Sequence, residues 1–259
     1  MGKTVQVRNM TLGEGLPKIC IPLTDTDFHS LKCSAKHILQ SSPDFVEWRA
    51  DFYHGYREES SRTEALCMLR DVLGEIPVLF TIRTKEEGGL ADLSIDEYAS
   101  INHSVIESVL ADLVDVELMK GDAVMEQLCI AAHEIPACGN SSATVKIVAS
   151  RHDFSKTPPE SEIVNSLCKM QTLGADIAKF AVMPTCERDV LTLLSATLTM
   201  KEHHPDTPVI TMSMGQLGAL SRVCGTLVGS AVTFGTAGAA SAPGQLPAEV
   251  LKLFLKNLK

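Results

Sequence analysis

The chain has 259 residues, of which 45% are hydrophobic and 21% charged, and its formal net charge is −9. A chain this apolar can bury enough surface to fold, which excludes disorder as its main state. The acidic balance argues against a nucleic-acid partner, which would need a basic face, although a few arginines can still hold a small anionic substrate.

No segment indicates a membrane or exported protein. The apolar runs, such as Pro77–Ile82 and Val145–Ser150, are far shorter than the ~20 residues of a spanning helix. The start of the chain, Met1–Asn9, lacks the apolar core of a signal peptide. The sequence has 8 cysteines and no Cys-x-x-Cys pair, which favours free thiols in a reducing cytosol over disulfides or a zinc site. We therefore expect a cytoplasmic protein with no membrane contact.

The predicted elements alternate along the chain. Residues 1–16 predict a β-hairpin, because Thr4–Arg8 alternates polar and apolar residues and glycines follow at Gly13 and Gly15. Apolar runs then predict eight strands: Lys18–Leu23, Phe45–Asp51, Pro77–Arg83, Leu113–Leu118, Val145–Asp153, Asp176–Met183, Pro208–Met214 and Ala231–Gly235. Helical spacing between them predicts eight helices: Asp27–Gln40, Ser60–Leu73, Ser94–Leu110, Asp122–His133, Pro159–Leu173, Glu187–His203, Gln216–Val228 and Pro247–Leu258.

Strict alternation of strand and helix predicts a parallel sheet. Eight such units in a chain of this length favour a single α/β domain over residues 1–259, a closed (β/α)8 TIM barrel. The hairpin of residues 1–16 is expected to close the barrel floor. An open doubly wound sheet is the alternative, but no Gly-x-Gly-x-x-Gly turn follows an early strand.

Charged residues occupy one face of several predicted strands. In the second strand Glu47 and Arg49 alternate with Val46 and Trp48, and later strands repeat the pattern with Thr81, Arg83, Asp115, Glu117 and Lys179. The outer face of a barrel strand packs under helices, so the charged set should point inward, near the end where barrels carry their active sites. Such burial is costly unless the groups are paired or used. The pattern predicts a salt-bridge network or, for the whole ring, a polar site.

Lys179 is the most informative of these residues, because all its neighbours in the strand are apolar. Desolvation and nearby cations favour a neutral lysine amine, which can attack a carbonyl and form a Schiff base. A charged lysine paired with a carboxylate fits the pattern equally well. Both interpretations stay open at this point.

His152 ends the strand next to the one that carries Lys179, so the two can reach a common substrate. Histidine acts as an acid or a base near neutral pH, although an isolated strand-end histidine more often makes only a local hydrogen bond. Arg222 and Glu87 alone are typical of exposed surface. The small-residue loop 236–246 is either a plain turn or a segment that closes over a ligand.

Ten short segments follow one another at characteristic spacing: EWRAD at 47–51, FTIR at 80–83 with EGG at 87–89, DVEL at 115–118, HDF at 152–154 with TP at 157–158, GADIAK at 174–179, AVMP at 181–184, TMSMG at 211–215, SR at 221–222, TFG at 233–235 and SAPGQ at 241–245. Each is modest alone, but the ordered set is highly specific. Together they resemble the type I 3-dehydroquinate dehydratases, the Schiff-base-forming family of the shikimate pathway.

The resemblance implies a hydro-lyase that removes water from 3-dehydroquinate with syn stereochemistry to give 3-dehydroshikimate, the third step towards chorismate and aromatic amino acids. It implies that Lys179 forms an iminium with the C3 ketone, that His152 moves protons at C2 and at the C1 hydroxyl, and that Glu87 orients His152. Substrate binding would fall to Glu47, Arg49, Arg83, Arg222, Ser241 and Gln245. It implies no metal or cofactor, and a homodimer.

Two positions and two alternatives stay open. Pro22 stands where many relatives have a serine that touches substrate, and Arg151 has no evident partner. Another class I Schiff-base barrel, such as an aldolase, is the runner-up, and the lack of a basic phosphate loop weighs against it. A non-catalytic ligand-binding barrel would keep the inward charges, but it gives no reason for Lys179 to lie beside His152.

Overall fold

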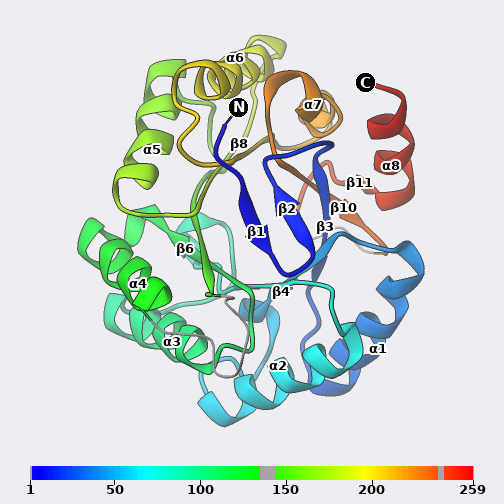
Figure 1. Ribbon diagram of the computed structural model, residues 1–259, viewed down its shortest axis with the longest axis vertical. Helices are drawn as coiled ribbons and strands as arrows, with labels where there is room; N and C mark the ends of the chain where they lie inside the picture. Colours follow the sequence, from blue (N-terminus) through cyan, green and yellow to red (C-terminus); the bar gives the residue numbers. More distant parts are fainter. Residues whose placement is uncertain (1, 135–143, 239–241, 259) are drawn as a thin grey trace.

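Figure 1 shows the computed structural model of the chain, which describes residues 2–134, 144–238 and 242–258. Within these ranges helices surround one curled sheet, whose strands run in the spatial order β11-β10-β3-β4-β5-β6-β7-β8-β9. The strands are β3 (Lys18–Leu23), β4 (Phe45–Arg49), β5 (Val78–Thr81), β6 (Leu113–Glu117), β7 (Lys146–Asp153), β8 (Ile177–Val182), β9 (Val209–Ser213), β10 (Val232–Thr236) and β11 (Leu246–Pro247). The α-helices are α1 (Phe28–Ile38), α2 (Glu59–Leu73), α3 (Ile95–Ser108), α4 (Asp122–Glu134), α5 (Glu160–Thr172), α6 (Glu187–His203), α7 (Gly225–Val228) and α8 (Ala248–Asn257).

The sheet curls until β9 and β10, near the two ends of this order, come together. Neighbouring strands pair in parallel, with β3 beside both β10 and β4 and with β8 beside β9. Just before β10, Ala231 N donates to Val209 O at 2.8 Å, and Thr211 N donates to Ser230 Oγ at 3.1 Å. The predicted α/β class is therefore confirmed, and each of the eight predicted strands is present.

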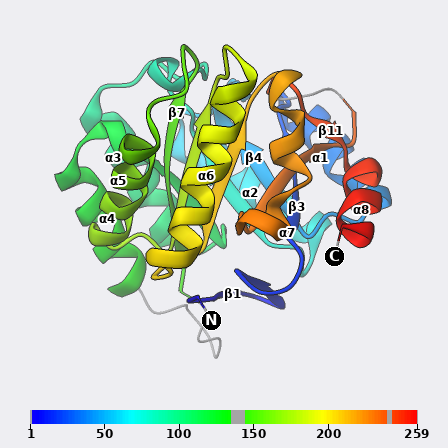
Figure 2. The same cartoon turned by 90° about the horizontal axis from the view of Figure 1, so that it is seen from above.

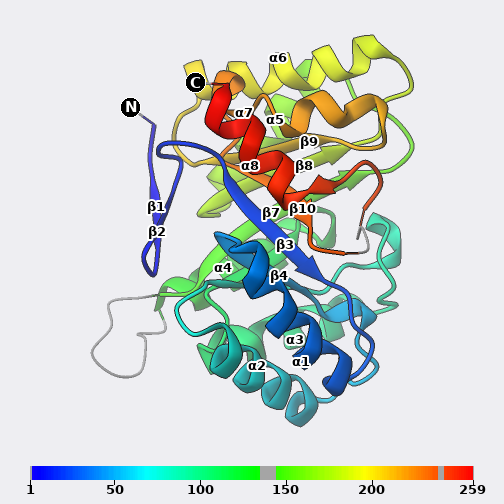
Figure 3. The same cartoon turned by 90° about the vertical axis from the view of Figure 1, so that its right-hand side faces the viewer.

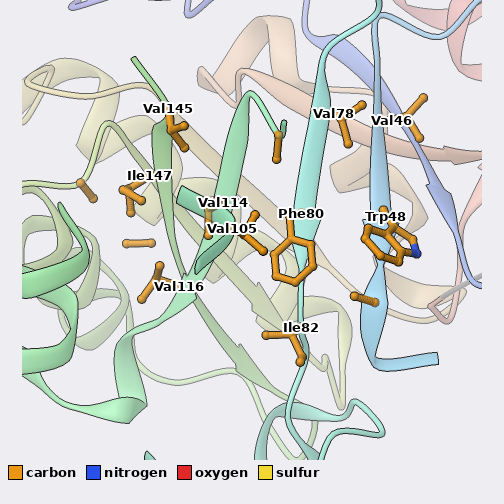
Figure 4. Close-up of a cluster of buried hydrophobic side chains, with 14 of the residues drawn as sticks. Val46, Trp48, Val78, Phe80, Ile82, Val105, Val114, Val116, Val145 and Ile147 are labelled. Atoms are coloured by element: carbon orange, nitrogen blue, oxygen red, sulfur yellow. The ribbon is translucent and has the colours of Figure 1, made fainter. Parts of the chain in front are cut away.

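The outward faces of the strands carry the apolar side chains that hold the helices. Trp48 and Phe80 lie on neighbouring strands with their rings edge to face, 5.6 Å apart, and Figure 4 shows them beside Val46, Val78 and Ile82. Burying one such side chain contributes roughly 1.5–3 kcal/mol. The alternation read from the sequence is thus the alternation between helix-facing and inward-facing residues.

The inward faces fill the lower interior in apolar layers, each built from alternate strands, as (β/α)8 interiors are. The lowest layer consists of Phe45, Leu113, Ile177 and Val232, and the next consists of Cys20, Leu79, Val148 and Ile210. Above these two layers the inward positions carry Glu47, Asp115 and Lys179, which lie close together. The site is therefore at the carboxyl ends of the strands.

The residues before β3 form an antiparallel hairpin of β1 (Val5–Val7) and β2 (Met10–Leu12). Its buried side chains, Val5, Val7, Met10 and Leu12, belong to the same apolar cluster as the two interior layers. Figures 2 and 3 show the hairpin at the end of the sheet where the strands begin.

The segment after β9 differs from the single helix predicted over Gln216–Val228. It forms a 3-10 helix, η5 (Leu217–Arg222), and then the one-turn α7. Gly218 lies so close to β9 that a Cβ there would be 2.2 Å from Ser213 O, and glycines in the segment lower its helix propensity. By contrast α3 begins where the helix predicted over Ser94–Leu110 does, and Ser94 and Glu97 form a capping box there.

None of the helices in the described ranges is both long and apolar enough to cross a bilayer. Seven cysteines lie in those ranges, and all seven are free thiols. Cys138 lies outside the described residues.

Candidate active site

The carboxyl ends of the strands surround a pocket of about 160 Å³. Seven residues expected to act in catalysis or binding line it: Glu47, Arg49, Arg83, Glu87, His152, Lys179 and Gln245. The other lining residues are Gly88, Phe154, Ala181, Met212, Met214, Phe234, Ala242 and Pro243. A larger and more open hollow of about 640 Å³ lies beside the hairpin at the opposite end, and neither Lys179 nor His152 lines it.

Lys179 lies in the first charged layer of the interior and is 3% exposed. Its Nζ is 3.1 Å from Asp115 Oδ2 and 3.5 Å from Glu47 Oε1, and it lies 4.9 Å from the centre of the Phe234 ring. These four residues come from alternate strands, β4, β6, β8 and β10. Lys179 is therefore paired with carboxylates and faces the pocket as well, so both sequence interpretations describe part of its environment.

Arg83 balances the carboxylates around Lys179. Its Nη2 donates to Asp115 Oδ1 at 2.8 Å, and its Nη1 donates to Glu117 Oε1 at 2.9 Å and to Ser150 Oγ at 3.0 Å. Burial opposes ionisation of Asp115, but the charges of Arg83 and Lys179 outweigh it and lower the pKa of Asp115. Asp115 is thus a fixed negative charge against Lys179.

His152, at the end of β7, is held by Glu87. His152 N donates to Glu87 Oε2 at 3.0 Å, and Nδ1 is 2.8 Å from the same oxygen. Burial, aided by Arg83 and Lys179, lowers the pKa of His152 well below its usual value, so the ring is neutral at pH 7. Burial raises the pKa of Glu87 to about 8, with Arg83 acting against it.

Hydrogen bonds define the tautomer of His152. Glu87 Oε2 accepts the backbone N–H of His152 at 3.0 Å and lies 3.5 Å from Arg83 Nη1. Among the described residues Oε1 is buried without a hydrogen-bond partner. Nδ1–H then donates to Oε2, which leaves the lone pair that a base needs on Nε2 of His152.

Arg49 and Glu47 form the wall of the pocket on β4. Arg49 makes a bidentate pair with Asp51, with both N···O distances 2.8 Å, and its guanidinium lies 5.0 Å from the centre of the Phe52 ring. Glu47 Oε1 accepts a hydrogen bond from Thr81 Oγ1 at 2.9 Å. These contacts fix both side chains before any ligand binds.

Arg222, at the end of η5, is buried but is not one of the residues that line the pocket. Its Nη2 donates to Pro243 O at 2.9 Å, and Pro243 does line the pocket. Nε and Nη1 are buried without a partner among the described residues, and burial lowers the pKa of Arg222 to about 10. Two donors thus stay available for an anion. Ser241, also expected here, lies outside the described residues.

Comparison with known proteins places this site in a family. The sequence model of type I 3-dehydroquinase matches residues 19–259. The chain belongs to the type I 3-dehydroquinase family. The family resemblance read from the ten sequence segments is therefore confirmed.

Similar proteins cover the chain from end to end. The 3-dehydroquinate dehydratase of Clostridioides difficile is 43% identical over 258 residues, which cover 100% of this chain and 98% of that protein. The enzyme of Bacillus licheniformis is 44% identical over 262 residues and is covered in full, as is this chain. Among solved structures, type I 3-dehydroquinate dehydratase from C. difficile with covalently modified comenic acid has a TM-score of 0.93 at 43% identity, and the match covers 100% of this chain and 98% of that one.

The structure shows the surroundings of the two positions left open by the sequence. Pro22 is not among the residues that line the pocket. Arg151 points away from it towards α5, where it contacts Ser166 Oγ at 2.8 Å and Glu162 Oε1 at 3.0 Å. Its guanidinium also lies 5.2 Å from the centre of the Phe180 ring. Arg151 therefore links α5 to β7, the strand that carries His152.

Sequence reasoning missed the apolar residues of the pocket wall and the buried hydroxyl of Ser150. Met212, Met214 and Phe234 line the pocket, and their spacing of two along strands was the signal that could have found them. Ser150 donates to Asp115 Oδ1 at 2.6 Å and is fully buried. No motif marked it, because its importance comes from contacts with two other strands.

Proposed function

We propose that the chain removes water from 3-dehydroquinate to give 3-dehydroshikimate, with Lys179 as the amine that bonds covalently to the substrate. Membership of the family makes the protein a hydro-lyase of the shikimate pathway, which leads to aromatic amino acids. The observation that carries the mechanism is the shared pocket: Lys179 and a neutral His152 line it together.

Lys179 acts on the C3 ketone. The amine attacks the carbonyl carbon, the carbonyl oxygen leaves as water, and a protonated iminium remains. The iminium withdraws electrons and makes the neighbouring C2 proton acidic. Asp115 and Glu47 hold the Lys179 side chain in one position before the ketone arrives, so little orientational freedom is lost in the reaction.

His152 performs the elimination. Its Nε2 takes the proton from C2, and the resulting imidazolium donates a proton to the C1 hydroxyl, which leaves as water on the same face. Glu87 accepts the Nδ1–H bond throughout and so keeps the ring in the tautomer that the first step needs. A positioned acid–base group contributes about 10²–10⁴-fold in rate. Hydrolysis of the product iminium then restores the free amine.

The remaining expected residues hold the substrate. We assign the substrate carboxylate to Arg222, because its Nε and Nη1 are buried without a described partner and a guanidinium binds a carboxylate with two parallel bonds. Glu47, Arg49 and Arg83 would meet the ring hydroxyls, and Gln245, from the loop before β11, would cover them together with Ser241.

The finer expectations about architecture and assembly also belong to this proposal. We propose that the curled sheet closes into a single eight-stranded (β/α)8 barrel over residues 1–259 and that the hairpin covers its floor. The hydrogen bond from Ala231 N to Val209 O and the burial of Val5 and Leu12 with the interior layers support it. A cytoplasmic homodimer stays a prediction, to be checked by light scattering and cell fractionation.

Trapping of the covalent intermediate tests the function. Borohydride added during turnover of 3-dehydroquinate should leave a reduced adduct on Lys179, located by peptide mass spectrometry. Lys179→Ala should lose both adduct and turnover, whereas Lys32→Ala, on the exposed side of α1, should keep both. A wild-type protein with no adduct would refute the covalent mechanism. Carbon–carbon cleavage products in place of the ultraviolet absorbance of a conjugated enone would favour the aldolase alternative.

A further inference from the structure

Glu87 belongs to a short 3-10 turn whose conformation depends on contacts with neighbouring elements. It ends η3 (Lys85–Glu87), a single 3-10 turn that follows β5. A turn this short has few internal hydrogen bonds, so its position over His152 must be set by neighbouring elements. Two buried contacts contribute to this, one on each side of the turn.

The first contact joins the carboxylate of Glu117, on β6, to Thr84, which precedes η3. Glu117, fully buried at the end of β6, accepts Thr84 N through Oε1 at 2.8 Å and Thr84 Oγ1 through Oε2 at 2.6 Å. Arg83 Nη1 donates to the same Oε1 at 2.9 Å. Both carboxylate oxygens of Glu117 therefore accept hydrogen bonds from the consecutive residues Arg83 and Thr84.

Thr84 in turn is the residue from which η3 extends. Its carbonyl oxygen accepts Glu87 N at 3.1 Å and Gly89 N at 2.8 Å, and its side chain is fully buried. A displacement of Thr84 would therefore pass directly to the backbone of Glu87. The Thr84 hydroxyl donates to Glu117 Oε2 at 2.6 Å, so this bond holds the start of η3 against β6.

The second contact lies on the other side of the turn. Gly88 has a left-handed backbone, with φ of 80°, and the ring of Phe154 packs against it. A Cβ on Gly88 would lie 2.3 Å from Phe154 Cε2. Since Phe154 follows His152 by two residues, the ring ties the strand end that carries His152 to the turn that carries Glu87.

We propose that Thr84 and Glu117 are positioning residues for the reaction, whose contact seats η3 so that Glu87 holds His152 over the substrate. The inference rests on the proposed function, because it requires His152 to be the base. Neither residue lines the pocket, so both act through Glu87. A misplacement of about 1 Å in a catalytic group can lower a rate about 10²-fold.

Substitution of Thr84 by valine tests this, because valine keeps the shape of threonine and removes only the hydroxyl. Thr197→Val is the matched control: Thr197 is also fully buried and makes two hydrogen bonds, to Leu193 O and Thr211 Oγ1, far from η3. Thr84→Ser, which restores the hydroxyl, is the conservative rescue. The measurements are kcat, KM, melting temperature and the fraction of enzyme that carries a covalent adduct during turnover, read by intact-protein mass spectrometry.

We expect Thr84→Val to lower kcat by about tenfold to 10²-fold with KM within a few-fold of the wild type. The covalent adduct should accumulate, because proton transfer slows after the iminium has formed. Thr84→Ser should recover most of kcat, and Thr197→Val should change neither kcat nor the adduct fraction. Thr84→Ala removes the same hydroxyl without adding a methyl group, and it should give the same pattern if the valine variant does not fold.

Two results would overturn the inference. In one, Thr84→Val behaves like Thr197→Val. In the other, Thr84→Val loses stability and kcat together, with no accumulation of adduct and no rescue by serine, which is the behaviour of a purely structural contact. Failure of the proposed function looks different, because the wild-type protein itself would then form no adduct on Lys179.

Discussion

Replacing Glu87 with glutamine should make the protein more heat-stable at alkaline pH while making it a poorer catalyst. Burial raises the pKa of Glu87 to about 8 from an ordinary 4.5, although Arg83 pulls it down. The folded state therefore binds this proton more tightly than the unfolded state does. Such a group contributes stability that is fully present below its unfolded pKa and is lost as the pH rises to its folded pKa. Glutamine cannot ionise, so the variant avoids this loss.

The size of the effect follows from the pKa difference. Between the two pKa values, each pH unit lowers the free energy of unfolding of the wild type by about 1.4 kcal/mol. From about pH 5 to pH 8 the loss is roughly 3 kcal/mol, once the rounded ends of the titration are included. For a chain of this size 1 kcal/mol corresponds to about 2–4 °C in Tm, so the gap between variant and wild type should widen by roughly 6–12 °C.

Scanning calorimetry at about pH 5, 6, 7 and 8 checks this, with Glu86→Gln as the matched control. Glu86 is the preceding residue of the same turn, but it is exposed and pairs with Lys120 at 3.3 Å. Its substitution should give a Tm difference that does not widen towards alkaline pH. A Tm difference for Glu87→Gln that stays constant across the four pH values would refute the reasoning that burial of the Glu87 carboxyl disfavours its charge.

Two further predictions concern the substrate. His152→Ala should lower kcat by about 10²–10⁴-fold and let the Lys179 adduct accumulate in intact-mass spectra; turnover within a few-fold of the wild type would contradict the role of His152. Arg222→Gln should lower kcat/KM by about 10–100-fold, mainly through KM in initial-rate measurements. Its melting temperature should not fall, because a buried guanidinium with two unpartnered nitrogens is removed; an unchanged KM would show that Arg222 does not bind the carboxylate.

Strand alternation was sufficient to predict which residues point inward. A period of two places Glu47, Asp115 and Lys179 on the face opposite their apolar neighbours, and the structure confirms that face for all three. What alternation could not provide is the contact between Lys179 and Asp115, because β7 lies between their strands. Residues of alternate strands share a layer only through the stagger of a curled sheet, and stagger is not encoded in any one strand.

The burial of Arg222 could not be predicted from the sequence for a different reason. The helix expected over Gln216–Val228 would have placed Arg222 on an exposed helical face. The close approach of Gly218 to Ser213 O folds the segment into η5 instead, and Arg222 becomes buried. Local periodicity cannot report such a contact, since it depends on how near the backbone of β9 passes.

Hydrogen bonds at the amino ends of the strands help to set the stagger between neighbouring strands. Three strands are preceded by an aspartate whose carboxylate accepts a backbone N–H near the start of the previous strand: Asp44 from Ile19 at 2.7 Å, Asp112 from Val78 at 2.8 Å and Asp176 from Ile147 at 2.9 Å. Each hydrogen bond fixes the register of one strand relative to its neighbour. Three residues after these aspartates come Glu47, Asp115 and Lys179. The side chains that meet around the reactive amine are therefore brought to one level by bonds made at the opposite end of their strands.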